Sequence, residues 1–324
     1  MISMKVSVVT PNYNGKDFLY AYFESLIKNS NEIGEVIIVD NGSRDGSQEF
    51  IRNYREKVDF PIVLIENSQN LGFAEAVNQG ISKARYDYIF SLNNDTVVEK
   101  SAILELLNLL NTEERIFSVS SKMVQFNNSE LIDDAGDDYT LLAYTKKRGN
   151  NQNLNKFIEV SEVFSSCAGA ALYRKDLLEE LGGFDSEFFA YMEDVDLGYR
   201  ARINGYKNLF CPNAIVYHIG SATTGSQYNE FKVRLAARNN VWVVYKNLPI
   251  PQKIVNVLFL FLGFLIKYVF FLKKGFGPIY LNGLKEGLRT RNKIKKVEFK
   301  SKNWKNYFKI EYELIKNTFK LLKR

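Results

Sequence analysis

Short apolar runs alternate with segments of helical periodicity over roughly the first hundred residues, and this alternation restricts the possible folds more than any other feature. The apolar runs occupy 6–10, 36–39, 62–65 and 86–92, and a helical pattern follows each of them. Neighbouring strands that are joined by a helix run parallel, because the helix returns the chain to the edge where the first strand began. The sequence therefore predicts an α/β fold with a doubly wound, mostly parallel sheet.

Each predicted strand stops at a polar or glycine-containing segment. Open α/β sheets bind ligands beyond the carboxyl ends of their strands. An aromatic ring there can stack on a base, and a carboxylate can accept a hydrogen bond from a base N–H or a ribose hydroxyl. Suitable residues lie beyond the strand ends or in the helices that follow, namely Tyr13, Asp40, Asn41, Asn70, Asn78 and Asp95.

The segment Asn93-Asn94-Asp95 ends the fourth apolar run. One carboxylate beside two amides offers the oxygen ligands that can hold a divalent cation on a diphosphate. An Asn/Asp turn that only ends a strand is the alternative interpretation. The sequence contains neither Gly-x-Gly-x-x-Gly nor a Gly-Lys-Ser/Thr phosphate loop, so neither a nicotinamide enzyme nor a P-loop NTPase is favoured. A nucleoside diphosphate held through a metal ion remains compatible.

A second group of acidic residues opens a predicted helix at Glu193, Asp194 and Asp196. Carboxylates in a first helical turn are stabilised by the helix dipole and need no catalytic explanation. The aromatic segment 188–192, however, would shield part of this group from water. We interpret it as a site where a base acts on a bound hydroxyl.

His218, the only histidine, follows another apolar run at a predicted strand end. A lone histidine is often structural, but this one could bind a metal ion beside Asp95. The polar segment 126–155 has no clear periodicity and reads either as a flap that contacts a second substrate or as a solvated surface insertion.

Composition is that of a soluble globular protein, with 46% apolar and 25% charged residues. The two cysteines, Cys167 and Cys211, are far apart in sequence and fit a reducing compartment. The chain enters its first apolar run almost at once, without the pattern of a signal peptide, so we expect the catalytic part to stay in the cytoplasm.

The last part of the chain is basic and partly very apolar. Residues 254–272 are interrupted only by Asn256 and Lys267. About 19 residues could just span a bilayer, but Lys267 and the aromatic content better suit an interfacial helix, and a buried core helix is the third possibility. The net charge is +6, and the basic excess gathers after Lys267, in Lys273, Lys274, Lys285, Arg289, Arg291, Lys293, Lys295, Lys296, Lys300, Lys302, Lys305, Lys309, Lys316, Lys320, Lys323 and Arg324.

This charge predicts an anionic membrane surface as partner. Nucleic acid is disfavoured, because no recognised reading module accompanies the charge. We expect one domain over 1–246 and a helical, basic, membrane-associated extension over 247–324.

Taken together, the motifs resemble those of family two glycosyltransferases with the GT-A fold, which is Rossmann-like, and in particular their rhamnosyltransferase-like branch. The resemblance extends over roughly residues 5–245. It rests on Val8-Val9-Thr10-Pro11-Asn12-Tyr13-Asn14-Gly15, Val39-Asp40-Asn41-Gly42-Ser43, Asn70-Leu71-Gly72-Phe73-Ala74, Leu92-Asn93-Asn94-Asp95-Thr96, Gly182-Gly183-Phe184-Asp185, Glu193-Asp194-Val195-Asp196-Leu197 and His218.

The resemblance implies a role for each site residue. Asp95 matches the last acid of the family's Asp-x-Asp motif and would bind Mg²⁺ or Mn²⁺ with His218, whereas Asn93 replaces the first acid. Asp194 matches the catalytic base, and Glu193 would support it. The implied nucleotide-sugar contacts are Pro11, Tyr13, Asp40 and Asn41 at the base and ribose, with Asn70, Asn78, Asn93 and Asn94 near the nucleotide.

The implied activity is inverting, metal-dependent transfer of a sugar from a nucleoside-diphosphate sugar to a hydroxyl of a lipid-linked glycan. Rhamnose is one candidate sugar, and the enzyme would build cell-surface polysaccharide from the inner face of the plasma membrane as a peripheral protein. Two alternatives remain: a non-catalytic nucleotide-sugar-binding or scaffold protein, and a nucleotidyltransferase. The latter would need more basic residues in its first glycine-containing loop than Lys16.

Overall fold

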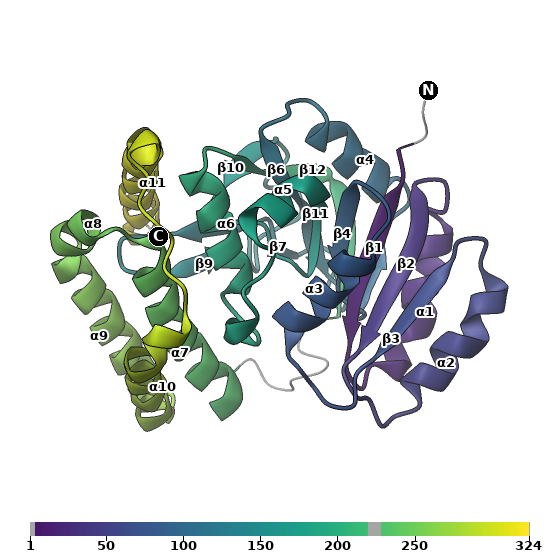
Figure 1. Cartoon of the computed structure of the whole chain (residues 1–324), viewed down its shortest axis with the longest axis horizontal. Coiled ribbons are helices and arrows are strands. Elements are labelled where there is room, and N and C mark those ends of the chain that lie inside the picture. The colour runs from purple at the N-terminus through teal and green to yellow at the C-terminus, as the bar shows by residue number, and fades with distance from the viewer. Residues whose placement is uncertain (1–3, 220–227, 324) are drawn as a thin grey trace.

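The computed structural model describes residues 4–219 and 228–323, in which helices pack on both faces of one large sheet (Figure 1). Residues 1–3, on which part of the expectation about a signal peptide rests, lie outside this range. Within the described residues the sheet has ten strands. They are β1 (Val6–Asn12), β2 (Ile33–Asp40), β3 (Ile62–Glu66), β4 (Tyr88–Leu92), β5 (Thr96–Val98), β6 (Ile116–Gln125), β7 (Ile132–Asp134), β10 (Ser161–Val163), β11 (Ala170–Arg174) and β12 (Lys207–His218).

The first four strands are parallel, as the alternation predicts, in the spatial order β4-β1-β2-β3. The other half of the sheet corrects the prediction of a mostly parallel sheet, because β11 runs antiparallel between β4 and β6. No helix lies between β6 and β11, so the chain re-enters the sheet at the edge it has just left. The result is a mixed sheet.

Both faces of the sheet are buried beneath helices. Helices α1 (Lys16–Ile27), α2 (Ser47–Tyr54) and α4 (Ala102–Leu110) cover one face, and α3 (Phe73–Lys83), α5 (Lys175–Leu181) and α6 (Glu193–Ile203) cover the other. Successive residues of a strand point to opposite faces, so Val8 packs in the first layer and Val9 in the second.

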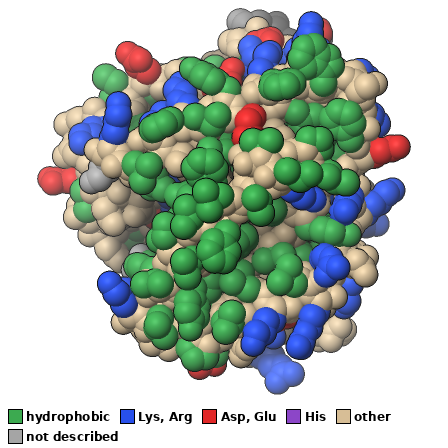
Figure 2. Space-filling model, turned by 90° about the vertical axis from the view of Figure 1, so that its left-hand side faces the viewer, with side chains coloured by type: hydrophobic (Ala, Val, Ile, Leu, Met, Phe, Trp, Pro, Cys, Tyr) green, Lys and Arg blue, Asp and Glu red, His purple; other side chains and the backbone are tan. Residues whose placement is uncertain are grey.

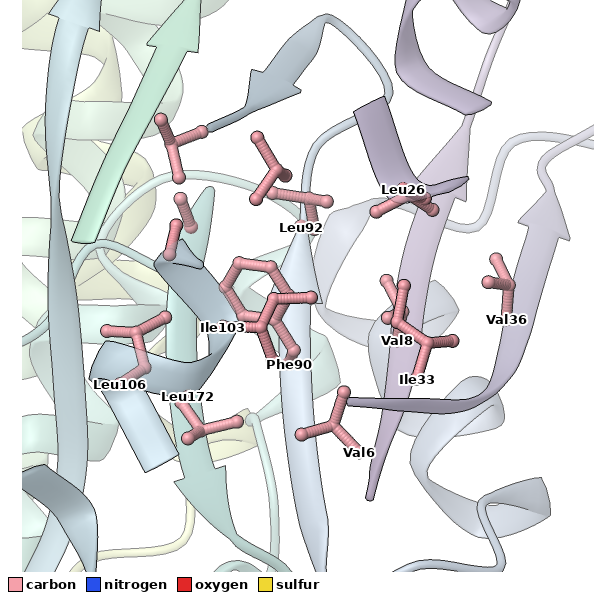
Figure 3. Close-up of a cluster of buried hydrophobic side chains, with 14 of the residues drawn as sticks. Val6, Val8, Leu26, Ile33, Val36, Phe90, Leu92, Ile103, Leu106 and Leu172 are labelled. Atoms are coloured by element: carbon pink, nitrogen blue, oxygen red, sulfur yellow. The ribbon is translucent and has the colours of Figure 1, made fainter. Parts of the chain in front are cut away.

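Figure 3 shows the first layer, where Phe90 and Leu172 of adjacent strands meet Ile103 of α4. Each fully buried side chain of this size contributes about 1.5–3 kcal/mol. The strands that end at the polar segments are therefore held rigidly.

The segment 126–155, predicted as a loop or insertion, is largely ordered. It contains β7 and a two-stranded sheet of β8 (Asp137–Tyr139) and β9 (Thr145–Lys147). Strands of three residues are too short to leave a recognisable period in the sequence.

The described chain from residue 228 onward is mainly helical, as predicted. Its helices are α7 (Glu230–Asn247), α8 (Ile250–Val255), α9 (Val257–Lys273), α10 (Gly277–Thr290) and α11 (Trp304–Leu322). Helix α10 packs closely on α7, because a Cβ on Gly283 would lie only 2.4 Å from the Arg234 carbonyl oxygen. Residues of α11 share a core with α6 and β8. The predicted domain boundary after Lys246 falls in the last turn of α7.

The apolar stretch 254–272 is divided at Asn256, between α8 and α9. Helix α9 has 17 residues, and across 4–219 and 228–323 no helix combines the length and hydropathy that crossing a membrane requires. Lys267 turns inward, where its Nζ donates to the Ala143 carbonyl over 3.1 Å.

Candidate active site

The predicted polar segments meet at one edge of the large sheet. Strands β1 to β4, β6 and β12 end there, and the reversed strand β11 begins there. The Asn93 amide donates to the Gly169 carbonyl over 2.9 Å. The neighbouring Ala168 amide donates to the Asp194 carboxylate over 3.4 Å. The segment that carries Asp95 and the helix that carries Asp194 therefore border one site.

A hydrogen-bond network joins the ends of β1, β2 and β4. Asn12 Nδ2 donates to Asp40 Oδ2 over 2.7 Å, and Asn12 Oδ1 accepts from Asn94 Nδ2 over 2.6 Å. Asp40 Oδ1 accepts from the Ser43 amide and from Gln48 Nε2, so both oxygens of this fully buried carboxylate are engaged. Asp40 and Asn94 thus hold two loops together, and a contact between Asp40 and a base would require an exchange of partners.

Three other side chains that were predicted to contact the nucleotide also form hydrogen bonds within the protein. The buried Asn41 donates to the Gly72 carbonyl over 3.0 Å, and Asn70 accepts from the Gly72 amide over 2.9 Å. Asn78 donates to the Phe184 carbonyl over 2.6 Å and accepts from the amide of the same residue over 3.0 Å. These side chains shape the entrance to α3 and anchor the chain before α6. Their direct contact with a nucleotide stays a prediction.

Tyr13, Pro11 and Asn93 occupy more open positions. Tyr13 is 38% exposed on the loop between β1 and α1, where its ring can meet a base. Pro11 pairs in register with Val39 just before that loop. The Asn93 side chain is half-buried beside Gly169, and a Cβ on that glycine would lie 3.1 Å from Asn93 Nδ2.

Asp95 and His218, the two predicted metal ligands, lie beside each other. His218 Nε2 is 3.5 Å from Asp95 Oδ1, and His218 Nδ1 is 2.8 Å from Asp133 Oδ2. A carboxylate at one ring nitrogen commonly orients the other towards a metal ion. The arrangement fits a cation held by two protein ligands and completed by diphosphate and water. Among the described residues, no group of three or more His, Cys, Asp or Glu side chains could hold a metal ion.

The same contacts determine the charge at this edge. Burial alone lowers the pKa of His218, but its hydrogen bonds to Asp133 and Asp95 raise that pKa to about 9. A bound proton or a bound cation at Nε2 therefore places positive charge beside Asp95. Positive charge there suits a diphosphate.

Glu193 and Asp194 begin α6 and present carboxylates of unusual basicity. Asp194 Oδ1 accepts from the Val195 amide over 2.8 Å. Glu193 is 6% exposed, and its Oε2 has no hydrogen-bond partner among the described residues. Burial raises the pKa of both groups, and the charge of Asp194 raises the pKa of Glu193 further. A carboxylate with a raised pKa is a stronger proton acceptor, as a general base requires.

The segment 126–155 adds to this site an acidic wall that was not predicted from the sequence. Asp133 and Asp134 come from β7, Asp137 from β8 and Lys147 from β9. Lys147 Nζ lies 3.5 Å from Asp133 and 3.9 Å from Asp134. Burial raises the pKa of Asp134 to about 6 although Lys147 lowers it. The paired acids at 133–134 and 137–138 were the only signal in the sequence, and it could not reveal which of them turn inward.

A comparison with models of known protein families shows to which family this chain belongs. The model of glycosyl transferase family 2 matches residues 7–182, which is more than half of the chain. This chain belongs to glycosyl transferase family 2. The matched residues include the ends of β1, β2 and β4 with Asp95, whereas Asp194 and His218 lie beyond them.

Curated relatives align with more than two thirds of this chain. The poly-beta-1,6-N-acetyl-D-glucosamine synthase of Staphylococcus aureus (strain MSSA476) is 26% identical over 226 residues, which are 69% of this chain and 52% of the relative. The corresponding synthase of Staphylococcus epidermidis is 25% identical over 233 residues. The chain thus spans about half the length of these relatives.

Solved structures show that this family 2 chain has the GT-A fold. GalNAc-T7 with UDP, GalNAc and Mn²⁺ aligns with a TM-score of 0.62 at 19% identity, over 75% of this chain and 48% of that one. S. aureus TarS 1-349 in complex with UDP-GlcNAc aligns with a TM-score of 0.60 at 17% identity, over 95% and 91%. At such identities the likeness concerns the fold.

In this family 2 chain, a clamped loop sets the position of Asp194. Phe189, Tyr191 and Met192 have positive φ angles of 65°, 68° and 72°, which L-residues rarely adopt. Asn239 of α7 holds the loop by donating from Nδ2 to three carbonyls. They belong to Phe188, Ala190 and Tyr191, at 2.9, 2.9 and 2.7 Å.

Proposed function

We propose that this chain transfers a sugar from a nucleoside-diphosphate sugar to a hydroxyl group, with inversion at the anomeric carbon. The observation that carries the proposal is the meeting of two groups at one edge of the sheet: Asp95 with His218, and Asp194 with Glu193. Positive charge is available at the first group and a basic carboxylate at the second, as transfer between a diphosphate and a hydroxyl needs.

In the proposed reaction, Asp194 takes the proton of the acceptor hydroxyl as its oxygen bonds to the anomeric carbon. The bond between that carbon and the diphosphate oxygen breaks at the same time, and the nucleoside diphosphate leaves with the electron pair. The Ala168 and Val195 amides hold the Asp194 carboxylate, while Tyr13 stacks on the base. A Mg²⁺ or Mn²⁺ ion held by Asp95 and His218 would supply positive charge to the departing diphosphate.

The relatives favour a UDP-linked N-acetylhexosamine as the donor. Two curated relatives are named for N-acetyl-D-glucosamine polymers, and the TarS structure contains UDP-GlcNAc. Rhamnose, which the resemblance in the sequence first suggested, has no support of this kind and is the second candidate donor. The names of those relatives suggest synthesis of a polysaccharide, and the resemblance in the sequence suggests that this polysaccharide belongs to the cell surface.

The acceptor is proposed to be a lipid-linked glycan, with the protein bound peripherally at the inner face of the plasma membrane. Figure 2 supports this attachment, because hydrophobic side chains cover the face formed by the last helices and Lys and Arg border it. The exposed residues include Leu258 (62%), Phe261 (63%), Phe308 (66%) and Tyr312 (69%). Apolar patches of this extent generally mark an interaction surface.

The test is a screen of nucleotide sugars for release of nucleoside diphosphate, with and without a chelator. We expect release from a UDP-N-acetylhexosamine that stops when the divalent cation is removed. Asp194→Asn should bind the donor normally but turn over about 10²–10⁴-fold more slowly. Asp176→Asn, which changes an exposed acid at the start of α5, should be as active as the wild type.

Two results would contradict the proposal. Full transfer by Asp194→Asn would remove the assigned base. Donor binding with no turnover of any acceptor would instead favour the non-catalytic nucleotide-sugar-binding protein.

A further inference from the structure

An apolar groove of about 500 Å³ runs between α7, α9 and α10. None of its lining residues belongs to the proposed transfer site around Asp95, His218, Glu193 and Asp194. Its walls are aliphatic and aromatic side chains, with a basic residue from α8 and one from the end of α10. The lining consists of Val241, Val244, Tyr245, Lys253, Phe261, Phe264, Leu265, Tyr268, Leu281, Leu284, Leu288 and Arg291.

Two lysines lie over the ring of Tyr245, which is one of the residues that line the groove. Lys253 Nζ lies 5.2 Å from the centre of the Tyr245 ring, and Lys296 Nζ lies 4.4 Å from it. Lys253 also donates to the Tyr245 carbonyl over 2.8 Å. Both lysines line a second hollow of about 360 Å³, so Lys253 belongs to both spaces.

The two lysines repel each other at this point. Burial, and after it the charge of Lys296, lowers the pKa of Lys253 to about 8. An anion between the two ammonium groups would relieve this repulsion. A ligand with a negative head and an apolar tail therefore matches both parts of the surface.

The groove opens on the apolar face described above. Phe261, Leu265, Leu281 and Leu288 line the groove and are each between 37% and 63% exposed. Figure 2 shows this face, on which the hydrophobic side chains form a continuous area. A molecule already embedded in a bilayer could enter the groove without passing through water.

We propose that this groove binds one anionic phospholipid, with its acyl chains between α9 and α10 and its phosphate between Lys253 and Lys296. The site would give the face that rests on the membrane a specific ligand, and it therefore depends on that part of the proposed function. The pair of cations over the Tyr245 ring favours a phospholipid over a second copy of the chain, which would bring the same positive charges to the interface.

The experiment measures binding of short-chain phosphatidylglycerol, kept below its micelle concentration, to the full chain by calorimetry. Short-chain phosphatidylcholine is the matched probe without net charge. Lys253→Gln should weaken binding of phosphatidylglycerol by about fivefold, the usual contribution of one cation near an anionic lipid. Lys309→Gln removes an exposed cation of α11 outside the groove and should leave binding unchanged.

Leu284→Trp narrows the groove and keeps every charge, so it should weaken binding of the monomeric lipid while vesicles still bind through the apolar face. Circular dichroism checks that all three variants fold. The proposal would be overturned if the two lipids bound equally well, or if Lys253→Gln and Lys309→Gln had equal effects on binding. It would also be overturned if light scattering showed a dimer that Leu284→Trp disrupts, because a second copy of the chain would then occupy the groove. Because no sugar donor is present, these outcomes do not depend on transfer activity.

Discussion

Two acids in the first turn of α6 have opposite environments, although only one residue separates them. Asp196 is fully buried, but Arg200, Lys246 and Asn247 all donate to it and hold its pKa below the ordinary value despite its burial. Asp194 accepts from backbone amides, and burial raises its pKa. Neighbouring carboxylates whose pKa values are driven apart have separate tasks. Asp196 fastens α6 to α7, and Asp194 is the candidate base.

The acid side of the pH–activity profile should report Asp194. A base works deprotonated, so kcat/KM falls as the pH falls through its pKa. Because burial raises this pKa above 3.8, we expect the fall to begin at a higher pH than an ordinary aspartate would give. Initial rates measured from pH 4 to pH 8 with the best donor test this. Constant activity down to pH 4 would contradict the assignment.

Lys267 should make the protein less stable at neutral pH than an apolar residue would. Burial lowers its pKa from 10.5 to about 7, so the unfolded chain holds more protons between these values and stability rises with pH across this range. Lys267→Met should therefore stabilise by about 1–3 kcal/mol near pH 7. The Ala143 carbonyl keeps its bond to Asn240. Urea unfolding at pH 7 and pH 10 measures the free energy of unfolding of both proteins. If Lys267→Met were stabilised as much at pH 10 as at pH 7, the burial of a charged Lys267 could not be the cause.

At the scale of elements, the loop before α6 depends on a helix that follows it in sequence. Phe188 to Met192 take a backbone path that Asn239 stabilises from α7. Gly72 completes the fit, because a Cβ there would lie 2.5 Å from the Phe189 carbonyl oxygen. The loop thus joins Gly72, at the start of α3, to Asp194.

Asn239→Ala should release this loop and lower kcat by about tenfold or more, while the KM for the donor changes little, because the proposed donor contacts lie on other elements. Asn282→Ala, at an exposed position of α10, is the matched control. Steady-state kinetics separates the two constants. A change confined to the donor KM would show that the loop serves the nucleotide instead.

The ends of helices and strands were easier to predict than the direction of each strand in the sheet. The helix end at Gly182-Gly183 was readable, because both glycines adopt positive φ angles of 81° and 65°. The strand ends and the acidic start of α6 were readable for similar local reasons. The reversal of β11 was not, since its direction depends on the absence of a helix within a polar segment. Nor could the sequence distinguish Asp40, whose oxygens bond to protein, from Asp95, which faces His218.

At the scale of the whole molecule, the transfer site and the apolar face lie on different sides of α7. The site is at the edge of the sheet, and the face belongs to α8, α9, α10 and α11 (Figures 1 and 2). The proposed lipid-linked acceptor would therefore have to extend past α7 to reach the site while the protein rests on the membrane.

Replacing exposed apolar residues of α9 should detach the protein from lipid. Leu258→Glu combined with Phe261→Glu should lower co-sedimentation with phosphatidylglycerol vesicles by about tenfold or more, because both side chains would otherwise be buried in the bilayer. Tyr20→Glu, at a 61% exposed position of α1, is the control. Unchanged sedimentation of the double variant would assign the face to another partner.

The reversed strand β11 has a consequence for synthesis of the chain. It fills the gap between β4 and β6, so both of these strands have an unpaired edge until residue 174 has left the ribosome. Unpaired edges recruit strands from other chains. A nascent chain stalled before this point should therefore aggregate or bind chaperones, and translation speed upstream of β11 becomes a determinant of yield.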